Sequence, residues 1–167
     1  SVDLVIGDMD LDGSPDVVVA NRDGALSGVH MYRRGRFEEA YTFGDGSTHA
    51  VELVDVDRDG RLDVAAGSLG GRNLIYLNEG DGPAVRTVTI CKRSRETWDI
   101  AIGDINGDGL PDVVEANRLA QDEIHLGEKN GFSGPIRFGP PKGDSRSVTL
   151  ADLDSDGDLD IIVGRRF

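Results

Sequence analysis

The sequence contains one cysteine, Cys91, and few aromatic residues, which make up 5% of its 167 positions. A single cysteine cannot form a disulfide within the chain, which excludes a small fold held together by disulfides. We expect Cys91 to pack as a small, half-buried strand residue. The scarcity of aromatic side chains, together with 23 glycines, argues against a core of large side chains and favours many tight turns.

Long apolar runs and an excess of basic residues are also missing. No run approaches the roughly 20 apolar residues of a membrane-spanning helix, so we expect no membrane span. Lysine and arginine number 18 against 31 aspartate and glutamate residues, which gives a formal net charge of -13. Because no dense basic patch occurs, a nucleic-acid partner is not expected. The acidic residues are gathered in short blocks.

Catalytic patterns are scarce as well. The three histidines, His30, His49 and His125, occupy unrelated positions, and no serine-nucleophile motif or catalytic zinc pattern accompanies them. The closely spaced carboxylates fall mainly within the acidic blocks. We therefore expect no enzymatic activity in this chain.

The acidic blocks form an internal repeat. They begin at Asp8, Asp55, Asp104 and Asp152, so that successive starts lie 47, 49 and 48 residues apart. Each block has an acidic or amide side chain at its first, third, fifth and ninth positions and a glycine at its sixth. A constant period of this length indicates a repeat architecture.

Short β-branched runs flank every block, which predicts a strand before and after it. Two more strand candidates follow in each of the first three repeats, at 28–32 and 37–41, at 73–77 and 85–90, and at 123–126 and 136–138. Four strands in about 48 residues are typical of a β-propeller blade. We predict an all-β fold of about three and a half four-stranded blades, forming a partial ring or an assembling subunit. The predicted divisions are 1–46, 47–95, 96–143 and a half blade at 144–167.

The composition of the blocks predicts calcium loops. Ca²⁺ takes six to eight oxygen ligands, and alternate side chains of a tightly curled loop can point into one cavity. We expect about four Ca²⁺ ions, each held by the side chains at positions 1, 3, 5 and 9 and by the carbonyl of position 7. The predicted ligands are Asp8, Asp10, Asp12, Ser14 and Asp16; Asp55, Asp57, Asp59, Arg61 and Asp63; Asp104, Asn106, Asp108, Leu110 and Asp112; and Asp152, Asp154, Asp156, Asp158 and Asp160.

Two other interpretations of the blocks are weaker. Asp-Gly pairs also mark ordinary β-turns, but a turn does not need several carboxylates close together, where they repel one another unless a cation is bound. An EF-hand loop shares positions 1, 3, 5 and 6 but requires a glutamate at position 12. Only Glu115 meets that requirement, and the flanking runs are too short and β-branched for helices. We expect Glu115 to be a strand residue that faces solvent.

Residues 102–114 (IGDINGDGLPDVV) and 74–80 (LIYLNEG) resemble the FG-GAP or VCBS-type repeats of integrin-α-like β-propellers. The resemblance extends over essentially the whole chain, although the Phe-Gly pair appears only at 43–44 and 138–139. It implies four-stranded blades around an axis, with the calcium loops joining strands 1 and 2 on one face. Rings of this family usually contain about twice as many blades as this chain supplies.

The resemblance also implies a location for ligands. The residues six positions before each loop, namely Val2, His49, Trp98 and Arg146, would lie near the axis on the face opposite the loops. The connections between strands 2 and 3 reach the same face and carry Arg22 and Arg118. We take His49, Trp98, Arg146, Arg22 and Arg118 as candidate ligand-binding residues. The alternative for Trp98 is packing between blades, and for the arginines a solvated loop position.

Members of the resembled family are mostly extracellular or at the cell surface. We therefore expect a secreted or cell-surface calcium-binding module that acts in cell adhesion or binds a protein or glycan without catalysis. One alternative is a structural subunit that assembles through open blade edges. Another is an accessory domain of a polysaccharide-active enzyme. The open edges would be covered by further blades of the same longer chain or by neighbouring copies.

Overall fold

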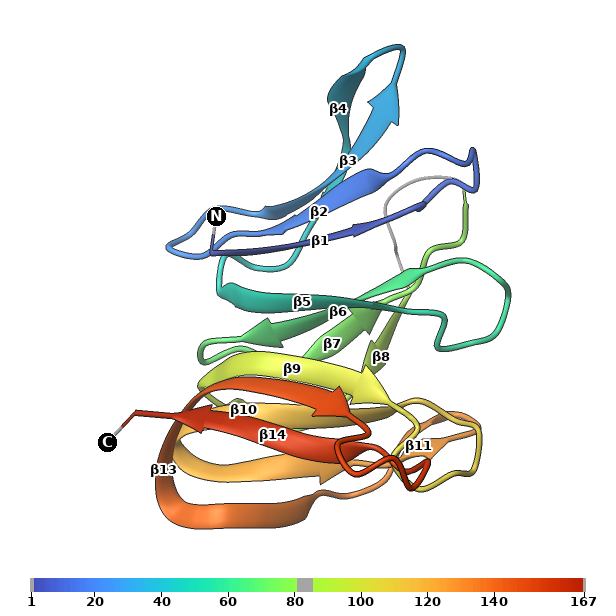
Figure 1. Ribbon diagram of the computed structural model, residues 1–167. Coiled ribbons are helices and arrows are strands. Elements are labelled where there is room, and N and C mark those ends of the chain that lie inside the picture. Colours follow the sequence, from blue (N-terminus) through green and yellow to red (C-terminus); the bar gives the residue numbers. More distant parts are fainter. Residues whose placement is uncertain (1, 81–85, 167) are drawn as a thin grey trace.

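The computed structural model describes residues 2–80 and 86–166, and this part of the chain is all-β (Figure 1). Its strands form antiparallel four-stranded sheets that follow one another along the sequence. No helix among these residues is long and apolar enough to cross a membrane. The prediction of an all-β repeat architecture is confirmed.

The first two sheets have the simple up-and-down order of a propeller blade. The first contains β1 (Asp3–Gly7), β2 (Asp16–Ala20), β3 (Ser27–Arg33) and β4 (Arg36–Phe43). The second contains β5 (Thr48–Val54), β6 (Asp63–Ser68), β7 (Leu74–Tyr76) and β8 (Thr87–Thr89). The strand expected at 85–90 is therefore shorter, and Val85 lies outside the described residues.

The third sheet contains β9 (Thr97–Gly103) and the long strand β10 (Asp112–His125), which folds back on itself. Leu119 has a positive φ of 56°, and the pairing register of β10 with β13 shifts between Arg118 and Ala120 and again between Ala120 and Asp122. Glu115 Oε1 and His125 Nε2 lie 3.5 Å apart. Because ten residues of straight strand would span about 33 Å, this contact requires a sharp reversal. β10 therefore supplies both the second and the third strand of its blade, and the short hairpin β11 (Gly127–Glu128) and β12 (Gly131–Phe132) follows it.

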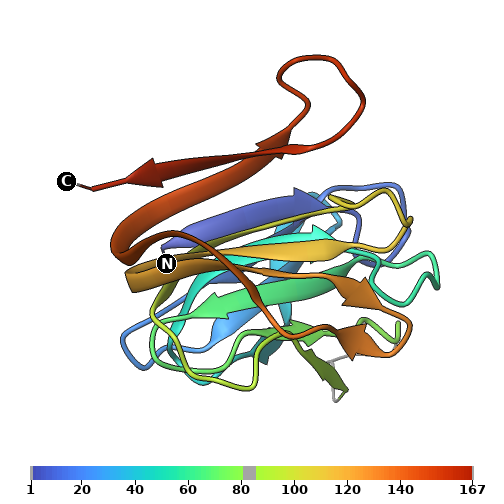
Figure 2. The ribbon, with the colours of Figure 1, turned by 90° about the horizontal axis from the view of Figure 1, so that it is seen from below.

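The strand β13 (Ile136–Ala151) is also shared between two units. Its first half pairs with β10, and its second half pairs with β14 (Asp160–Arg165). The sheet order β14-β13-β10-β9 thus joins one complete blade to the first two strands of the next. We call the second half of β13 together with β14 the C-terminal hairpin; Figure 2 shows it (red) at one end of the row of sheets. The chain forms a partial β-propeller of about three and a half blades whose sheets do not close into a ring.

Apolar packing lies mainly between successive sheets. Val18 and Val29 of the first sheet pack with Val51 and Val64 of the second, and all four are at most 3% exposed. A second cluster joins the second and third sheets, and a third joins the third sheet to the C-terminal hairpin. Burial of each valine-sized side chain contributes about 1.5–3 kcal/mol, so small side chains hold the sheets together.

Carboxylates also tie neighbouring first strands together. Val51 N donates to Asp3 Oδ2 at 3.0 Å, which links β5 to β1. Val148 N donates to Asp99 Oδ2 at 2.9 Å, which links β13 to β9 in the same way. The first strands of successive blades therefore lie side by side, as Figure 1 shows for β1, β5 and β9.

Candidate functional site

Each acidic block forms the loop between the first and second strands of its unit. The first residue of the block follows the first strand, and the ninth residue begins the second strand: Asp16 begins β2, Asp63 begins β6, Asp112 begins β10 and Asp160 begins β14. The apolar runs on either side pair as an antiparallel ladder, which brings the two ends of every loop together. All four predicted loops therefore lie at equivalent places in the fold.

The first carboxylate of every loop organises the turn by accepting two backbone hydrogen bonds. In the first loop Asp8 Oδ1 accepts from Asp12 N at 3.1 Å and Asp8 Oδ2 from Gly13 N at 2.9 Å. The same pair of bonds is formed by Asp55, Asp104 and Asp152. The glycine at position 6 has a φ between 81° and 96° in all four loops, a conformation that side chains with a Cβ rarely adopt. This explains the glycine in the repeat.

The carboxylates at positions 5 and 9 complete the loop. The position-5 carboxylate accepts the N–H of position 7 in every loop, at 2.7 to 2.9 Å. One oxygen of the position-9 carboxylate accepts the N–H of position 2 in every loop. In the three complete blades its other oxygen accepts a backbone N–H at or just after the end of the third strand. The donors of this second bond are Tyr32, Asn78 and Gly127. Asp160 is exposed because its unit has no third strand here.

The structure brings the carboxylates at positions 1, 3 and 9 together. In each of three loops one oxygen from each of these residues lies within 4.8 Å of the others; the groups are Asp8, Asp10 and Asp16; Asp55, Asp57 and Asp63; and Asp152, Asp154 and Asp160. The third loop has Asn106 at position 3, whose Nδ2 donates to Asp108 Oδ2 at 2.9 Å. An oxygen-only donor set of this kind suits a hard cation such as Ca²⁺. In addition, Asp10 Oδ1 is buried without a hydrogen-bond partner, as expected for an oxygen that binds an ion.

The local charges differ between loops. Burial raises the pKa of Asp63 to about 6; the N–H groups of Asn78 and Val56 oppose this shift, and Asp57 and Asp59 add to it. In the first loop Arg33 approaches Asp10 at 2.9 Å and offsets part of the negative charge. In the second loop Arg61 instead pairs with Asp59. Of these two loops, the second therefore has less positive charge beside its carboxylates at positions 1, 3 and 9, which are Asp55, Asp57 and Asp63.

A small pocket lies at the opposite end of the first strands. It has a volume of about 200 Å³ and is lined by Val2, Asp3, His49, Trp98, Asp99 and Arg146. The Arg146 guanidinium carbon lies 3.8 Å from the centre of the Trp98 ring, and the His49 ring centre lies 4.4 Å from it. His49 Nδ1 lies 2.8 Å from the Trp98 carbonyl oxygen. Three of the five candidate ligand residues thus meet in one place.

The remaining candidates lie elsewhere. Arg22 pairs with Asp23 at 3.4 Å, and Arg118 pairs with Glu96 at 2.8 Å; neither lines the pocket. Asp3 and Asp99 line the pocket but were missed from the sequence. Their signal was an aspartate five positions before the loop, which occurs only in the first and third repeats.

Two expectations about single residues are wrong. Glu115 does not face solvent; it is 0% exposed and lies in β10 at the interface with the second sheet, where Asn73 Nδ2 donates to its Oε1 at 2.7 Å. Cys91 is not a half-buried strand residue, because it is 6% exposed and lies after the end of β8. Alternation along a strand did not reveal Glu115 because its blade is covered on both faces.

Comparison with known proteins agrees with this geometry. The family described as FG-GAP-like repeat matches residues 8–66, 55–115 and 104–163, so each match runs from one acidic loop through the next. The chain is 28% identical over 125 residues to integrin alpha-6 of Gallus gallus, an alignment that covers 65% of this chain and 11% of that protein. The match therefore spans about a tenth of the length of the curated relative.

Proposed function

Since the chain belongs to the FG-GAP-like repeat family, we propose that it is a calcium-binding extracellular β-propeller module that binds a protein or glycan without catalysis. The observation that carries this proposal is the equivalent placement of four acidic loops, three of which gather carboxylates from positions 1, 3 and 9. We propose the divisions at 1–46, 47–95, 96–143 and 144–167 as its structural units.

About four Ca²⁺ ions are proposed, one for each loop. The side chains at positions 1, 3 and 9 would hold the ion, position 5 would approach it from the turn, and the carbonyl of position 7 would add a further oxygen. Bound Ca²⁺ supplies positive charge where like-charged carboxylates otherwise repel one another. The loop residues themselves fix the turn and connect the first strand to the second and third, so an ion in the loop would reinforce the whole blade.

Thermal unfolding with and without a calcium chelator tests this proposal. An ion that binds only the folded state raises the melting temperature. We expect a large increase with millimolar Ca²⁺ and a smaller one with Mg²⁺, because Mg²⁺ demands a near-ideal octahedral site and sheds water reluctantly. An unchanged melting temperature in Ca²⁺ would refute the proposal.

We propose that the ligand binds at the pocket around Trp98 and Arg146. The indole Nε1 of Trp98 and the Nε of Arg146 are buried without hydrogen-bond partners, so a small shift of these side chains would present two unused donors to a carboxylate or hydroxyl group. Ring and guanidinium side chains of this kind often dominate binding energies. For the proposed extracellular location we expect calcium dissociation constants of roughly 10⁻⁴ to 10⁻³ M, the range typical of extracellular modules.

Binding to a glycan array and to candidate cell-surface proteins tests the pocket. Trp98→Ala and Arg146→Ala should each abolish the binding, whereas Arg118→Ala and Arg22→Ala, at half-buried arginines outside the pocket, should leave it intact. Loss of binding in the second pair alone would move the ligand site to the connections between the second and third strands.

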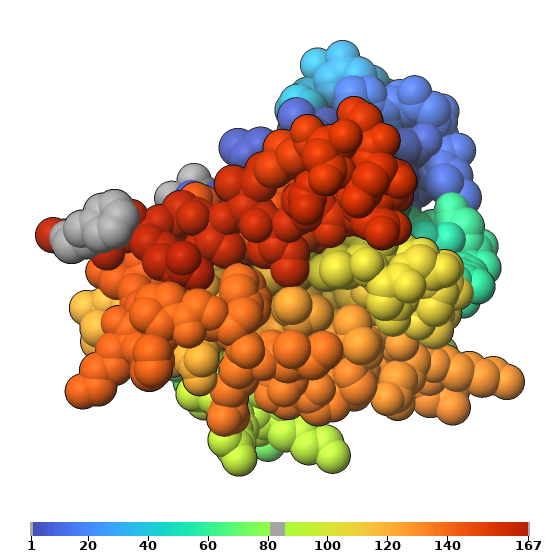
Figure 3. Space-filling model, turned by 60° about the horizontal axis from the view of Figure 1, so that its bottom comes forward, coloured from blue at the N-terminus to red at the C-terminus, as the bar shows by residue number. Residues whose placement is uncertain are grey.

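A second function, assembly through open blade edges, is favoured by an exposed apolar stripe. Leu4 and Ile6 of β1, the first strand of the first blade, are 54% and 62% exposed, and Val2, just before this strand, is 37% exposed. In the space-filling view the C-terminal hairpin (red) also lies at the surface (Figure 3). Further blades of a longer chain or a neighbouring copy would cover both ends. Sedimentation over a range of concentrations separates these cases, since self-assembly predicts higher species that Leu4→Lys removes.

A further inference from the structure

A buried group of side chains between the second and third blades has no part in the calcium loops. It contains Cys91, which follows β8, and Glu123 and His125, which lie in β10. One ligand atom from each lies within 4.8 Å of the others, and all three residues are buried. Glu115 adds a second carboxylate, since its Oε1 lies 3.5 Å from His125 Nε2.

Several polar atoms in this group lack partners. His125 is 1% exposed, and neither of its ring nitrogens forms a hydrogen bond. Its Nε2 is 3.5 Å from Glu115 and 3.9 Å from Glu123, distances that are too long for good hydrogen bonds. The Oε2 atoms of Glu115 and Glu123 are also buried and unpartnered. Buried polar atoms without partners are costly, so a group of four needs an explanation.

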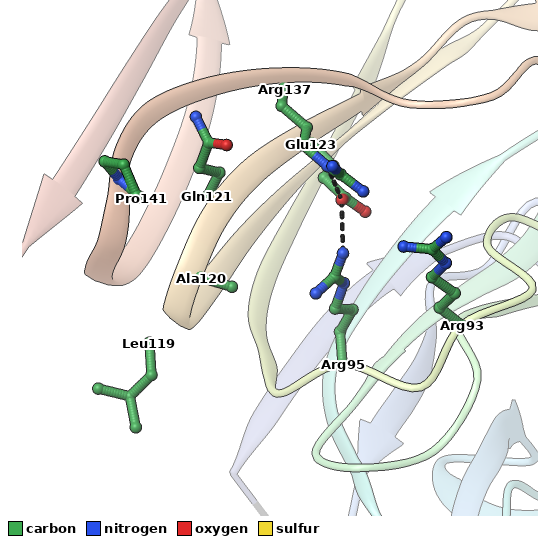
Figure 4. Close-up of a pocket in the computed structure, with 8 residues that line it drawn as sticks. All are labelled: Arg93, Arg95, Leu119, Ala120, Gln121, Glu123, Arg137 and Pro141. Atoms are coloured by element: carbon green, nitrogen blue, oxygen red, sulfur yellow. Dashed lines mark hydrogen bonds and ion pairs between the residues drawn. The ribbon is translucent and has the colours of Figure 1, made fainter.

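The second oxygen of each carboxylate is firmly held. Asn73 Nδ2 donates to Glu115 Oε1 at 2.7 Å. Arg95 and Arg137 both donate to Glu123 Oε1, at 2.8 and 3.0 Å, as Figure 4 shows. Partners of this kind commonly orient the carboxylates that bind metals, leaving the other oxygen free for the ion. The free Oε2 of Glu123 lies 3.9 Å from His125 Nε2, whereas the Glu115 oxygen that approaches the imidazole is the Oε1 held by Asn73, so Glu115 binds an ion only after its carboxylate turns.

We propose that Cys91, Glu115, Glu123 and His125 form a zinc site that joins the second blade to the third. The donor set of one sulfur, one nitrogen and two oxygens suits Zn²⁺, whereas Ca²⁺ binds oxygen alone. Ligands at 2.0–2.3 Å in a tetrahedron lie about 3.3–3.8 Å from one another, so the side chains close by about 1 Å when the ion binds. Nothing in the four calcium loops contributes to this site.

Charged side chains surround the imidazole. Glu115 and Glu123 lie 3.5 and 3.9 Å from His125 Nε2, and Arg95 and Arg137 pair with the outer oxygen of Glu123. The N–H of Arg93, 3.5 Å from the Cys91 sulfur, favours the thiolate. A metal ion that binds here displaces the thiol proton and any proton on the metal-binding nitrogen of the imidazole. Glu123 lines a surface cavity of about 310 Å³, which provides an entry path.

Cobalt spectroscopy of the intact chain, saturated with Ca²⁺ to fill the loops, tests the proposal. One equivalent of Co²⁺ should give tetrahedral visible bands and a near-ultraviolet thiolate charge-transfer band, and Zn²⁺ should remove both. Because Cys91 is the only cysteine, the thiolate band reports this residue alone. Absence of the band in the unmodified protein overturns the proposal and leaves the calcium loops unaffected.

Variants locate the site more closely. Cys91→Ser should remove the thiolate band, and His125→Gln should remove the tetrahedral visible bands. His30→Gln, in β3 of the first blade, should retain both features. Asn73→Ala should weaken zinc binding by about 10–100-fold, as loss of a partner that orients a metal ligand commonly does. If His125→Gln binds Co²⁺ with an unchanged spectrum, the assignment is wrong. Should Cys91→Ser fail to fold, the unmodified protein and His125→Gln still decide the question.

Discussion

Replacement of Asp57 by asparagine should change stability in opposite directions with and without calcium. Asp57 is exposed at position 3 of the second loop, and its side chain forms no hydrogen bond or ion pair with any residue that the structure describes. An oxygen of Asp57 lies within 4.8 Å of oxygens from Asp55 and Asp63. The substitution therefore removes two repulsive pairs at almost no cost in hydrogen bonds.

The magnitude follows from these distances. Two unit charges 4.8 Å apart repel by about 1 kcal/mol at the dielectric constant of water, and physiological salt reduces this by about half. The removal of two pairs should therefore stabilise the calcium-free protein by about 1 kcal/mol. For a chain of this length that corresponds to an increase of about 2–4 °C in the melting temperature.

Calcium reverses the sign. A site with a dissociation constant of roughly 10⁻⁴ to 10⁻³ M contributes about 1.4–2.7 kcal/mol at about 10 mM Ca²⁺. Loss of one ligand should remove most of that contribution, and after the gain of about 1 kcal/mol from relieved repulsion the variant should be less stable by about 0.4–1.7 kcal/mol, a decrease of about 1–7 °C relative to the unmodified protein in Ca²⁺. Differential scanning calorimetry in chelator and in Ca²⁺ measures both effects.

Glu128→Gln provides the control, because it removes an exposed carboxylate of β11 outside every acidic loop. It should shift the melting temperature equally in the two conditions. If Asp57→Asn also shifts it equally, the second loop does not bind calcium, and the explanation of its carboxylate cluster fails.

Three other substitutions probe the rest of the molecule. In chelator, the unfolding free energy should fall as the pH rises from about 4 to 6. The reason is that the raised pKa of Asp63 lets the folded state keep a proton that the unfolded state has lost. Urea titrations should show a shallower fall for Asp63→Asn. Asp99→Ala should cost about 1–3 kcal/mol in chemical denaturation, since it leaves the buried N–H of Val148 without its acceptor, and an unchanged midpoint would contradict the tie between first strands. Gly127→Ala should destabilise by about 1–3 kcal/mol, because its Cβ would lie 2.5 Å from the Pro111 carbonyl oxygen; a neutral result would mean that the backbone there can move.

The repeat made much of the fold predictable. The period of the acidic blocks and their β-branched flanks indicated four-stranded units, and the structure has them. The sequence did not reveal that β10 and β13 each run through two strand positions, since this depends on the tight reversal at Leu119 and on long-range pairing.

The candidate sites were predictable to different degrees. Equal spacing identified the residues around Trp98 as neighbours, because repeat-equivalent positions of adjacent first strands meet. The cluster at Cys91 and His125 breaks the repeat: its members occupy different positions in two blades. Only the three-dimensional packing of those blades brings them together.

The placement of the apolar clusters between the sheets has a consequence for unfolding. An interior blade is held by neighbours on both sides, whereas the C-terminal hairpin of β13 and β14 packs on one side only. In such a linear array, stability is shared between nearest neighbours and loss of order spreads inward from the ends. The two end units, the first blade and the hairpin that carries the fourth acidic loop, should therefore exchange their amide protons before the interior blades. A cation bound in the fourth acidic loop would stabilise this hairpin and slow its opening.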